Sequence, residues 1–247
     1  MAFHASMTTL TSLLIASSAA FALALLSAVA GFGGGVLLLP VFTALFGLRF
    51  AVPMLTLTQL SSNAGRVWLN RHHLNRRLIG WFALGAVPSA LAGGLFLAHA
   101  PLAPLKRALG VFLIGVVIWR RLRPAPRKPG DHAFIAVGAA SGLGSALLGS
   151  VGPLTAPFFL AYGLTRAAYI GTEATAALTM HLTKLAAYGA GDLLTGTVLL
   201  YGIVLTPVTL AGAWTGKKIV DRISDRVFVH LVEAGLIIAG VMFLIGL

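Results

Sequence analysis

The sequence contains no cysteine, which excludes disulfides, thiolate metal sites and cysteine nucleophiles. Charged residues are also scarce, at 10% of the chain, whereas soluble domains carry about 25%. Acidic residues are the scarcest, with 6 Asp and Glu against 18 Lys and Arg. Water is therefore not the main solvent that this composition suits.

The short motifs of common enzymes are missing as well. The chain has no GxSxG elbow, no HExxH helix and no Walker loop. Its longest glycine run, at 31–35, follows no strand of a βαβ unit, so it is not a nucleotide-binding fingerprint. The seven histidines are scattered. We therefore expect no enzyme activity, no cofactor and no metal site.

Apolar residues make up 58% of the 247 residues, and the mean hydropathy is +0.93. Runs near about 20 residues, the length of a membrane-spanning helix, recur along the chain. The hydropathy pattern predicts segments at 8–30, 34–48, 51–69, 78–100, 105–119, 133–148, 150–164, 167–190, 196–216 and 227–247. We therefore predict an all-α polytopic membrane protein.

The first apolar segment, at 8–30, and the positive net charge of the chain each have two possible interpretations. Residues 8–30 lack the basic flank of a secretory signal, because no Lys or Arg precedes Arg49, so we expect a retained helix.

The net charge of +12 would suggest a nucleic-acid partner if the protein were soluble. Here the basic residues cluster in short loops between apolar segments, which is typical of membrane proteins, so no nucleic-acid partner is expected.

The two halves of the chain align with each other at offsets between 116 and 119 residues. The matched pairs are Pro40 with Pro157, Gly47 with Gly163, Asn63 with His181, Arg66 with Lys184, Pro88 with Pro207, Gly93 with Gly212 and Arg107 with Arg226. Internal duplication is common in transporters. The sequence thus predicts one transmembrane transport domain over 1–247, with repeat one at 8–119, a basic cytoplasmic linker at 120–132 and repeat two at 133–247.

Loop charge predicts that the repeats have opposite orientations. The loop at 70–77 is basic and its counterpart at 191–195 is not, whereas 217–226 is more basic than 101–107. The positive-inside rule then places 70–77, 120–132 and 217–226 in the cytoplasm, although Lys106 and Arg107 oppose this orientation. We predict two inverted-topology repeats in the inner membrane, each a glycine-tipped broken or re-entrant hairpin plus three transmembrane helices, with both termini outside.

A glycine cluster lies at the hairpin position of each half. The first, GFGGGVLLLP, spans 31–40, and the second, SGLGSALLGSVGPLTAP, spans 141–157. Such clusters break a helix, and broken backbone is tolerated at membrane depth where it is packed in protein or lines a cavity. The free N–H groups at a helix start favour an anion. The alternative is that these glycines serve close helix packing only.

Polar residues inside the apolar segments form two matching stripes. In 51–69, Thr56, Gln59, Asn63 and Arg66 follow spacings of three and four, which place them on one helix face. The matching stripe in 167–190 consists of Glu173, Ala177, Met180, His181, Lys184 and Tyr188. Buried polar groups are costly in a bilayer, so we expect both stripes to face the other half. The predicted substrate-binding residues are Gly31, Gly33, Gly34, Gly35, Gln59, Asn63, Arg66, Gly149, Ser150, Gly152, His181 and Lys184, and the predicted proton-coupling residues are Glu173 and His181.

Other interpretations of these residues stay open at this point. Arg66 and Lys184 alternatively snorkel to the interface. Glu173 alternatively pairs with a basic residue, and Gln59 and Asn63 alternatively serve as interhelical hydrogen-bonding groups. For the whole chain, the alternatives to an anion transporter are a cation permease that uses Glu173 and His181, and a non-transporting membrane scaffold.

With GFGGGVLLLP at 31–40 and GLGSALLGSVGPLTAP at 142–157, the chain resembles the TauE/SafE sulfite exporter family of permeases. The resemblance covers essentially the whole chain, including the duplication and the basic central linker. It implies site residues among the glycines, and export of sulfite or an organosulfur anion such as sulfoacetate by alternating access coupled to protons. The expected partners are a small anion, the lipid bilayer and a second copy in a homodimer.

Overall fold

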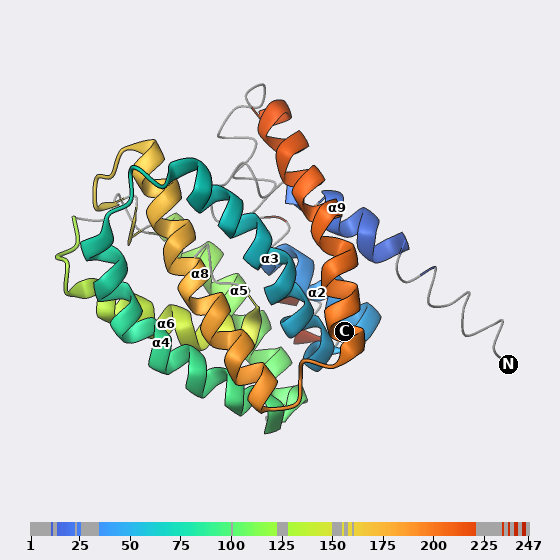
Figure 1. Cartoon of the computed structure of the whole chain (residues 1–247). Coiled ribbons are helices and arrows are strands. Elements are labelled where there is room, and N and C mark those ends of the chain that lie inside the picture. The colour runs from blue at the N-terminus through green and yellow to red at the C-terminus, as the bar shows by residue number, and fades with distance from the viewer. Residues whose placement is uncertain are drawn as a thin grey trace, which may run out of the picture.

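The computed structural model describes residues 11, 14–22, 24–25, 35–99, 101–122, 128–149, 155, 158–159, 161–220, 234, 237, 240–241 and 244–245. The regular elements among these residues are all helices (Figure 1). They are α2 (Gly35–Phe46), α3 (Leu48–Asn70), α4 (Arg76–His99), α5 (Leu102–Leu122), α6 (Ala133–Leu148), α8 (Arg166–Ala190) and α9 (Gly196–Val220). The all-helical fold predicted from hydropathy is confirmed.

Several helices extend further than the hydropathy pattern predicts. Because α5 begins at Leu102, Lys106 and Arg107 lie within a helix rather than in a loop. Similarly, α9 continues to Val220 and includes Lys217 and Lys218. At its other end α5 continues to Leu122, so the linker begins later than residue 120.

Polar side chains fix the starts of three helices. Asn75 Oδ1 accepts a hydrogen bond from Leu78 N at 3.0 Å at the start of α4. Thr165 is the N-cap of α8 and accepts from Ala168 N. Thr195 Oγ1 accepts from Val198 N at the start of α9. Each side chain satisfies one of the backbone donors that a helix start leaves free.

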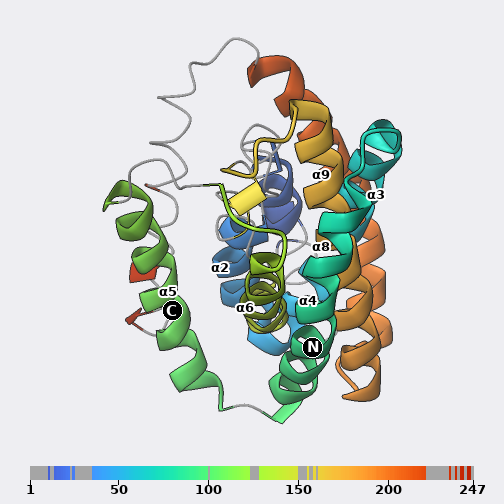
Figure 2. The same cartoon turned by 90° about the vertical axis from the view of Figure 1, so that its left-hand side faces the viewer.

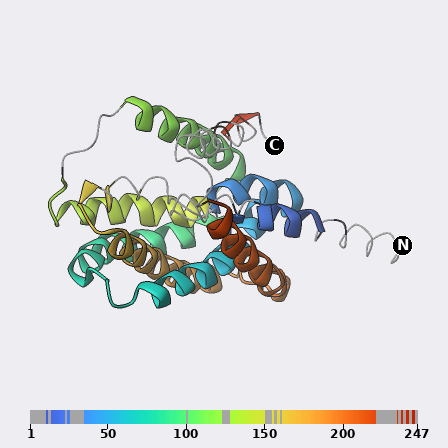
Figure 3. The ribbon, with the colours of Figure 1, turned by 90° about the horizontal axis from the view of Figure 1, so that it is seen from above.

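The helices form three layers when the molecule is seen from the side and from above (Figures 2 and 3). The helices α2 and α6 lie between α5 on one side and the group of α3, α4, α8 and α9 on the other. The described parts of both glycine clusters adjoin this middle layer, because 35–40 lie in α2 and 141–148 lie at the end of α6.

Helices α4 and α6 pack backbone to backbone through glycine. A Cβ on Gly85 would lie 1.9 Å from the carbonyl oxygen of Ile135, and one on Gly138 would lie 2.1 Å from that of Phe82. Gly142 approaches Ala86 in the same way. Small residues permit such approaches in membrane proteins. The packing interpretation is therefore correct for Gly142, at the start of the second glycine cluster.

The helices α3 and α8, which the internal alignment matches, lie side by side and run antiparallel (Figure 1). Their contacts show the direction, because Asn63 contacts His181, Arg66 contacts Glu173 and the backbone of Asn75 contacts Thr172. Residue numbers rise along one helix as they fall along the other. The matched residues Asn63 and His181 lie where the two helices meet.

Other matched positions have similar surroundings. Gly47 and Gly163 have φ angles of 81° and 85°, and each precedes one of the two matched helices. Gly93 of α4 packs against Leu143 and Ala146, and its match Gly212 of α9 packs against Phe21 and Ala24 near the N-terminus. The helix α4 packs on α8, and its match α9 packs on α3.

By length and composition, α4 is the one described helix suited to cross a membrane. Two shorter apolar helices occur at Ala133–Leu147 and Gly196–Gly212. The matched helices α3 and α8 have 23 and 25 residues, which is long enough to span, but they carry the polar stripes. The polarity that lowers their hydropathy is concentrated where they meet.

Candidate functional site

Two hydrogen-bonded groups of polar residues lie between α3, α8 and the end of α6, and we call them together the crossing network. Its side chains are largely buried, with Asn63 and His181 each 2% exposed and Lys184 fully buried. The members are Gln59, Asn63 and Arg66 of α3, Glu173, His181 and Lys184 of α8, and Ser145 and Gly149 at the end of α6.

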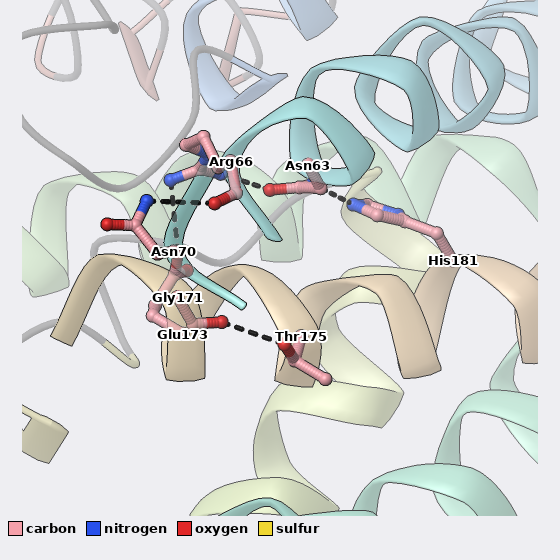
Figure 4. A network of polar contacts seen from close by, with 7 residues as sticks. All are labelled: Asn63, Arg66, Asn70, Gly171, Glu173, Thr175 and His181. Carbon is pink, nitrogen blue, oxygen red and sulfur yellow. Dashed lines mark hydrogen bonds and ion pairs between the residues drawn. The ribbon is translucent and has the colours of Figure 1, made fainter. Parts of the chain in front are cut away.

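Arg66 forms an ion pair with Glu173 of the opposite repeat (Figure 4). Its Nη1 lies 3.2 Å from Glu173 Oε2, and the Glu173 side chain is 5% exposed. The other terminal nitrogen, Nη2, donates to Asn63 Oδ1. Asn70 Nδ2 donates to the Arg66 carbonyl oxygen at 2.8 Å and so adds to the same cluster. The buried carboxylate is therefore compensated by a guanidinium from the matched helix.

Asn63 and His181 contact each other across the meeting point of the repeats (Figure 4). Asn63 Nδ2 lies 2.9 Å from His181 Nε2, and the two residues are 118 positions apart in the chain. The other ring nitrogen, His181 Nδ1, is buried without a hydrogen-bonding partner among the described residues. A buried ring nitrogen without a partner costs free energy unless a ligand or water satisfies it.

Lys184 caps the C-terminal end of α6. Its Nζ donates to the Ser145 carbonyl at 3.3 Å, to Ser145 Oγ at 2.8 Å and to the Gly149 carbonyl at 3.0 Å. One turn further along α8, Tyr188 Oη donates to the Ala146 carbonyl at 2.6 Å. The last carbonyls of a helix are free of helical bonds and carry partial negative charge. An ammonium group at this place satisfies them inside an apolar layer.

Gly149 lies directly after α6, in the middle of the second glycine cluster. Its φ of 74° falls in the region that favours glycine, and a Cβ there would lie 2.7 Å from Leu55 Cδ2. Leu39 of α2, one turn after Gly35, is the next neighbour on this side. Gln59 Nε2 also donates to the Gly149 carbonyl, at 3.5 Å. The start of α2 and the end of α6 thus lie near each other.

The described residues cover part of the predicted site. Gly35, Gln59, Asn63, Arg66, Gly149, Glu173, His181 and Lys184 are described, and seven of these eight belong to the crossing network, with Gly35 at the start of α2. Gly31, Gly33, Gly34, Ser150 and Gly152 lie outside the described residues. The network therefore joins most of the predicted polar residues.

The contacts decide between several alternatives left open by the sequence. Lys184 does not snorkel, because it is fully buried at the end of α6. Glu173 pairs with Arg66, as its simpler interpretation predicts. Gln59 and Asn63 are interhelical hydrogen-bonding groups, and this role is compatible with ligand binding. Within the part of the chain that is described, no three His, Cys, Asp or Glu side chains are grouped to hold a metal ion.

Some partners of the network could not be identified from the sequence. Ser145 is one such partner, because its Oγ accepts from the Lys184 ammonium at 2.8 Å. Thr172 Oγ1 accepts from the backbone N–H of Asn75 and so anchors the residue before α4 to α8. The signal that finds Asn70 is its spacing of four from Arg66, which extends the predicted stripe by one turn.

A second polar cluster ties the linker to both halves. Asp131 pairs with Arg77 of α4 at 2.8 Å and accepts from Tyr162 Oη at 2.7 Å. Lys128 lies 4.8 Å from the centre of the Tyr162 ring. Since Arg77 is 73% exposed, this cluster lies at the surface and contributes little to a buried site.

The chain is similar to one known protein family along most of its length. The family model of the sulfite exporter TauE/SafE matches residues 16–243, which is most of the chain. The chain belongs to the TauE/SafE family. As a TauE/SafE protein it is a membrane permease, and its all-helical fold with apolar helices agrees with this membership. Searches among curated proteins and among solved structures give no match.

Proposed function

We propose that this TauE/SafE protein exports a small anion, namely sulfite or an organosulfur anion such as sulfoacetate, by alternating access. The observation that carries the proposal is the crossing network, which holds a fully buried lysine, a partly buried arginine and a buried carboxylate where two matched helices meet. Buried charge at membrane depth is costly and marks substrate or ion pathways. Arg66 and Glu173 neutralise each other, so a bound anion would balance the remaining positive charge on Lys184.

The arrangement of α3 and α8 supports inverted-topology repeats. Two antiparallel helices that meet at equivalent residues are related by an axis perpendicular to both. If both helices span the bilayer, this axis lies in the membrane plane, as in inverted-repeat transporters. The matching surroundings of Gly93 and Gly212 fit the same axis. Rocking of one repeat against the other about the network would then expose it to each side in turn.

The end of α6 supports a broken hairpin. With 16 residues, α6 is about 24 Å long, which is less than a hydrocarbon core of about 30 Å. It ends at Gly149, whose carbonyl is held by Lys184 and Gln59 inside the bundle. We place the anion beside this end, where residues of the first glycine cluster and Ser150 and Gly152 are proposed to supply backbone donors. Glu173 and His181 are the proposed proton-coupling groups.

Flux in proteoliposomes tests the proposal. Radiolabelled sulfite is loaded with and without a pH gradient, with sulfoacetate as competitor. Arg76→Gln serves as the control variant, because Arg76 is an exposed cation outside the network. We expect saturable flux that the pH gradient accelerates. Absence of saturable flux for both anions would favour a scaffold, and flux lost in Glu173→Gln but kept in Lys184→Gln would favour a cation permease.

A further inference from the structure

The hydrogen bonds of Arg66 determine which atoms of Asn63 face which partner. A guanidinium has donors only, so the Asn63 atom that it contacts must be the oxygen Oδ1. The amide nitrogen Nδ2 must then point toward His181, where it lies 2.9 Å from Nε2. The orientation of the Asn63 amide is thereby assigned by the network rather than chosen freely.

This orientation fixes the protonation of His181. Because Asn63 Nδ2 donates, His181 Nε2 must accept, and an accepting nitrogen carries no proton. The ring is then neutral with its proton on Nδ1. That N–H is the atom left without a partner among the described residues, in a side chain that is 2% exposed. By fixing the orientation of the Asn63 amide, Arg66 therefore determines that His181 Nδ1 carries the proton. This N–H is a hydrogen-bond donor in the protein interior that has no acceptor among the described residues.

The charged residues near His181 determine which ligand its Nδ1–H group could bind. From α3 comes Arg66, from α8 come Glu173 and Lys184, and Arg66 and Glu173 pair with each other. Lys184 has no carboxylate partner among the described residues, and its three ammonium hydrogens are directed at oxygens of α6. Lys184 is one helical turn from His181 on the same face. The site thus presents one excess positive charge and one free N–H donor.

We propose that His181 Nδ1–H donates a hydrogen bond to an oxygen of a singly charged oxyanion, whose charge balances Lys184. This inference rests on the proposed anion transport and names its substrate class. A doubly charged anion would leave one negative charge uncompensated in an apolar layer, which is unfavourable. Sulfite therefore binds in its singly protonated form, hydrogensulfite, and sulfoacetate, which carries both a sulfonate and a carboxylate, binds more weakly. Arg66 and Asn63 are positioning residues in this arrangement, and His181 is the group that touches the ligand.

The variants separate the two nitrogens of the ring. In His181→Gln the side-chain amide takes the place of Nε2, so its oxygen still accepts from Asn63 while the Nδ1 donor is lost. His73→Gln is the matched control, because His73 is exposed in the loop after α3. Asn63→Asp keeps the acceptor for Arg66 but replaces the donor that faces His181 by an acceptor.

The first measurement is ¹⁵N NMR of histidine-labelled full-length protein in nanodiscs, with His181→Gln used to assign the signal. We expect His181 to be neutral and protonated on Nδ1, and Asn63→Asp to move a proton onto Nε2. A wild-type His181 that is protonated on Nε2 would overturn the proposal, because no donor would then face the ligand.

The second measurement is binding of methanesulfonate and of sulfate, two tetrahedral anions of similar size that differ by one charge. We expect methanesulfonate to bind at least about tenfold more tightly than sulfate, and His181→Gln to weaken methanesulfonate by about tenfold or more. His73→Gln should bind as the wild type does. Equal affinities for the two anions, or unchanged affinity in His181→Gln, would contradict the inference while leaving anion transport in place. Failure of the wild type to bind or transport any anion would remove the proposed function itself.

Discussion

The two cations of the crossing network occupy matched positions and are stabilised in different ways. Arg66 pairs with Glu173, a carboxylate from the opposite repeat. At the position matched to Glu173, the first repeat has Leu55, and Lys184 instead contacts the carbonyls at the end of α6. The Arg66 side is therefore neutral as a pair, whereas the Lys184 side keeps its charge. On the proposed function, the charge of Lys184 is the one that balances a ligand.

Removing the carboxylate from the compensated side should have the largest effect. Glu173→Gln leaves Arg66 in a largely buried site without a counter-charge, and we expect a loss of about 3 kcal/mol in stability because breaking a buried pair exposes an uncompensated ion. Thermal unfolding in detergent measures this. The double variant Arg66→Gln/Glu173→Gln should recover part of the loss. If Glu173→Gln is as stable as the wild type, the Arg66 side is not held by this pair.

Adding a carboxylate near Lys184 should give this cation a counter-charge, as Glu173 does for Arg66. Leu55→Glu places an acid at the position matched to Glu173, beside Gly149, which Lys184 contacts. A counter-charge within about 8 Å removes about 2 kcal/mol of attraction for an anion, so methanesulfonate affinity should fall by about thirty-fold. Leu55→Gln is the uncharged control and should lose much less. Similar losses in both variants would show that packing, not charge, determines the affinity.

Glycines with positive φ, of which the described residues include Gly47, Gly149 and Gly163, give the smallest expected effect. Gly47 and Gly163 have open space where a Cβ would lie, whereas Gly149 would meet Leu55. We expect Gly163→Ala to cost about 1 kcal/mol from backbone strain alone. Gly149→Ala should cost about 1 kcal/mol more, because Leu55 must shift. Thermal unfolding of the two variants measures the difference, and equal losses would mean that Gly149 is not tightly packed against α3.

The sequence predicted the residues of the network better than their pairing. Spacings of three and four identified the faces that carry Asn63, Arg66, His181 and Lys184, because one period governs both helices. Alignment of the halves matched Asn63 with His181, which do meet. The pairing of Arg66 with Glu173 depends on the register of two helices separated by 107 positions, and no local pattern encodes that register.

Helix ends and polar partners depended on tertiary packing in the same way. The hydropathy pattern ended a segment at residue 216 because the charges of Lys217 and Lys218 lower the local average, yet α9 extends through these residues. The loop-charge argument placed Lys106 and Arg107 in a loop at 101–107, yet α5 extends through them. Lys184 contacts the end of α6 only because α6 packs close to α8, and this packing could not be predicted from the sequence. A lysine in an apolar segment is compatible with either a cap or a snorkelling side chain until that neighbour is known.

The most direct test of the uncompensated charge is sulfite flux in proteoliposomes for wild type and Lys184→Met, which preserves the length of the side chain while removing its charge. Arg76→Gln, which also removes one cation but at the surface, is the reference. We expect saturable flux in the wild type and in Arg76→Gln, and a loss of about a hundredfold in Lys184→Met. Flux in Lys184→Met equal to that of the wild type would contradict a binding site balanced by this charge.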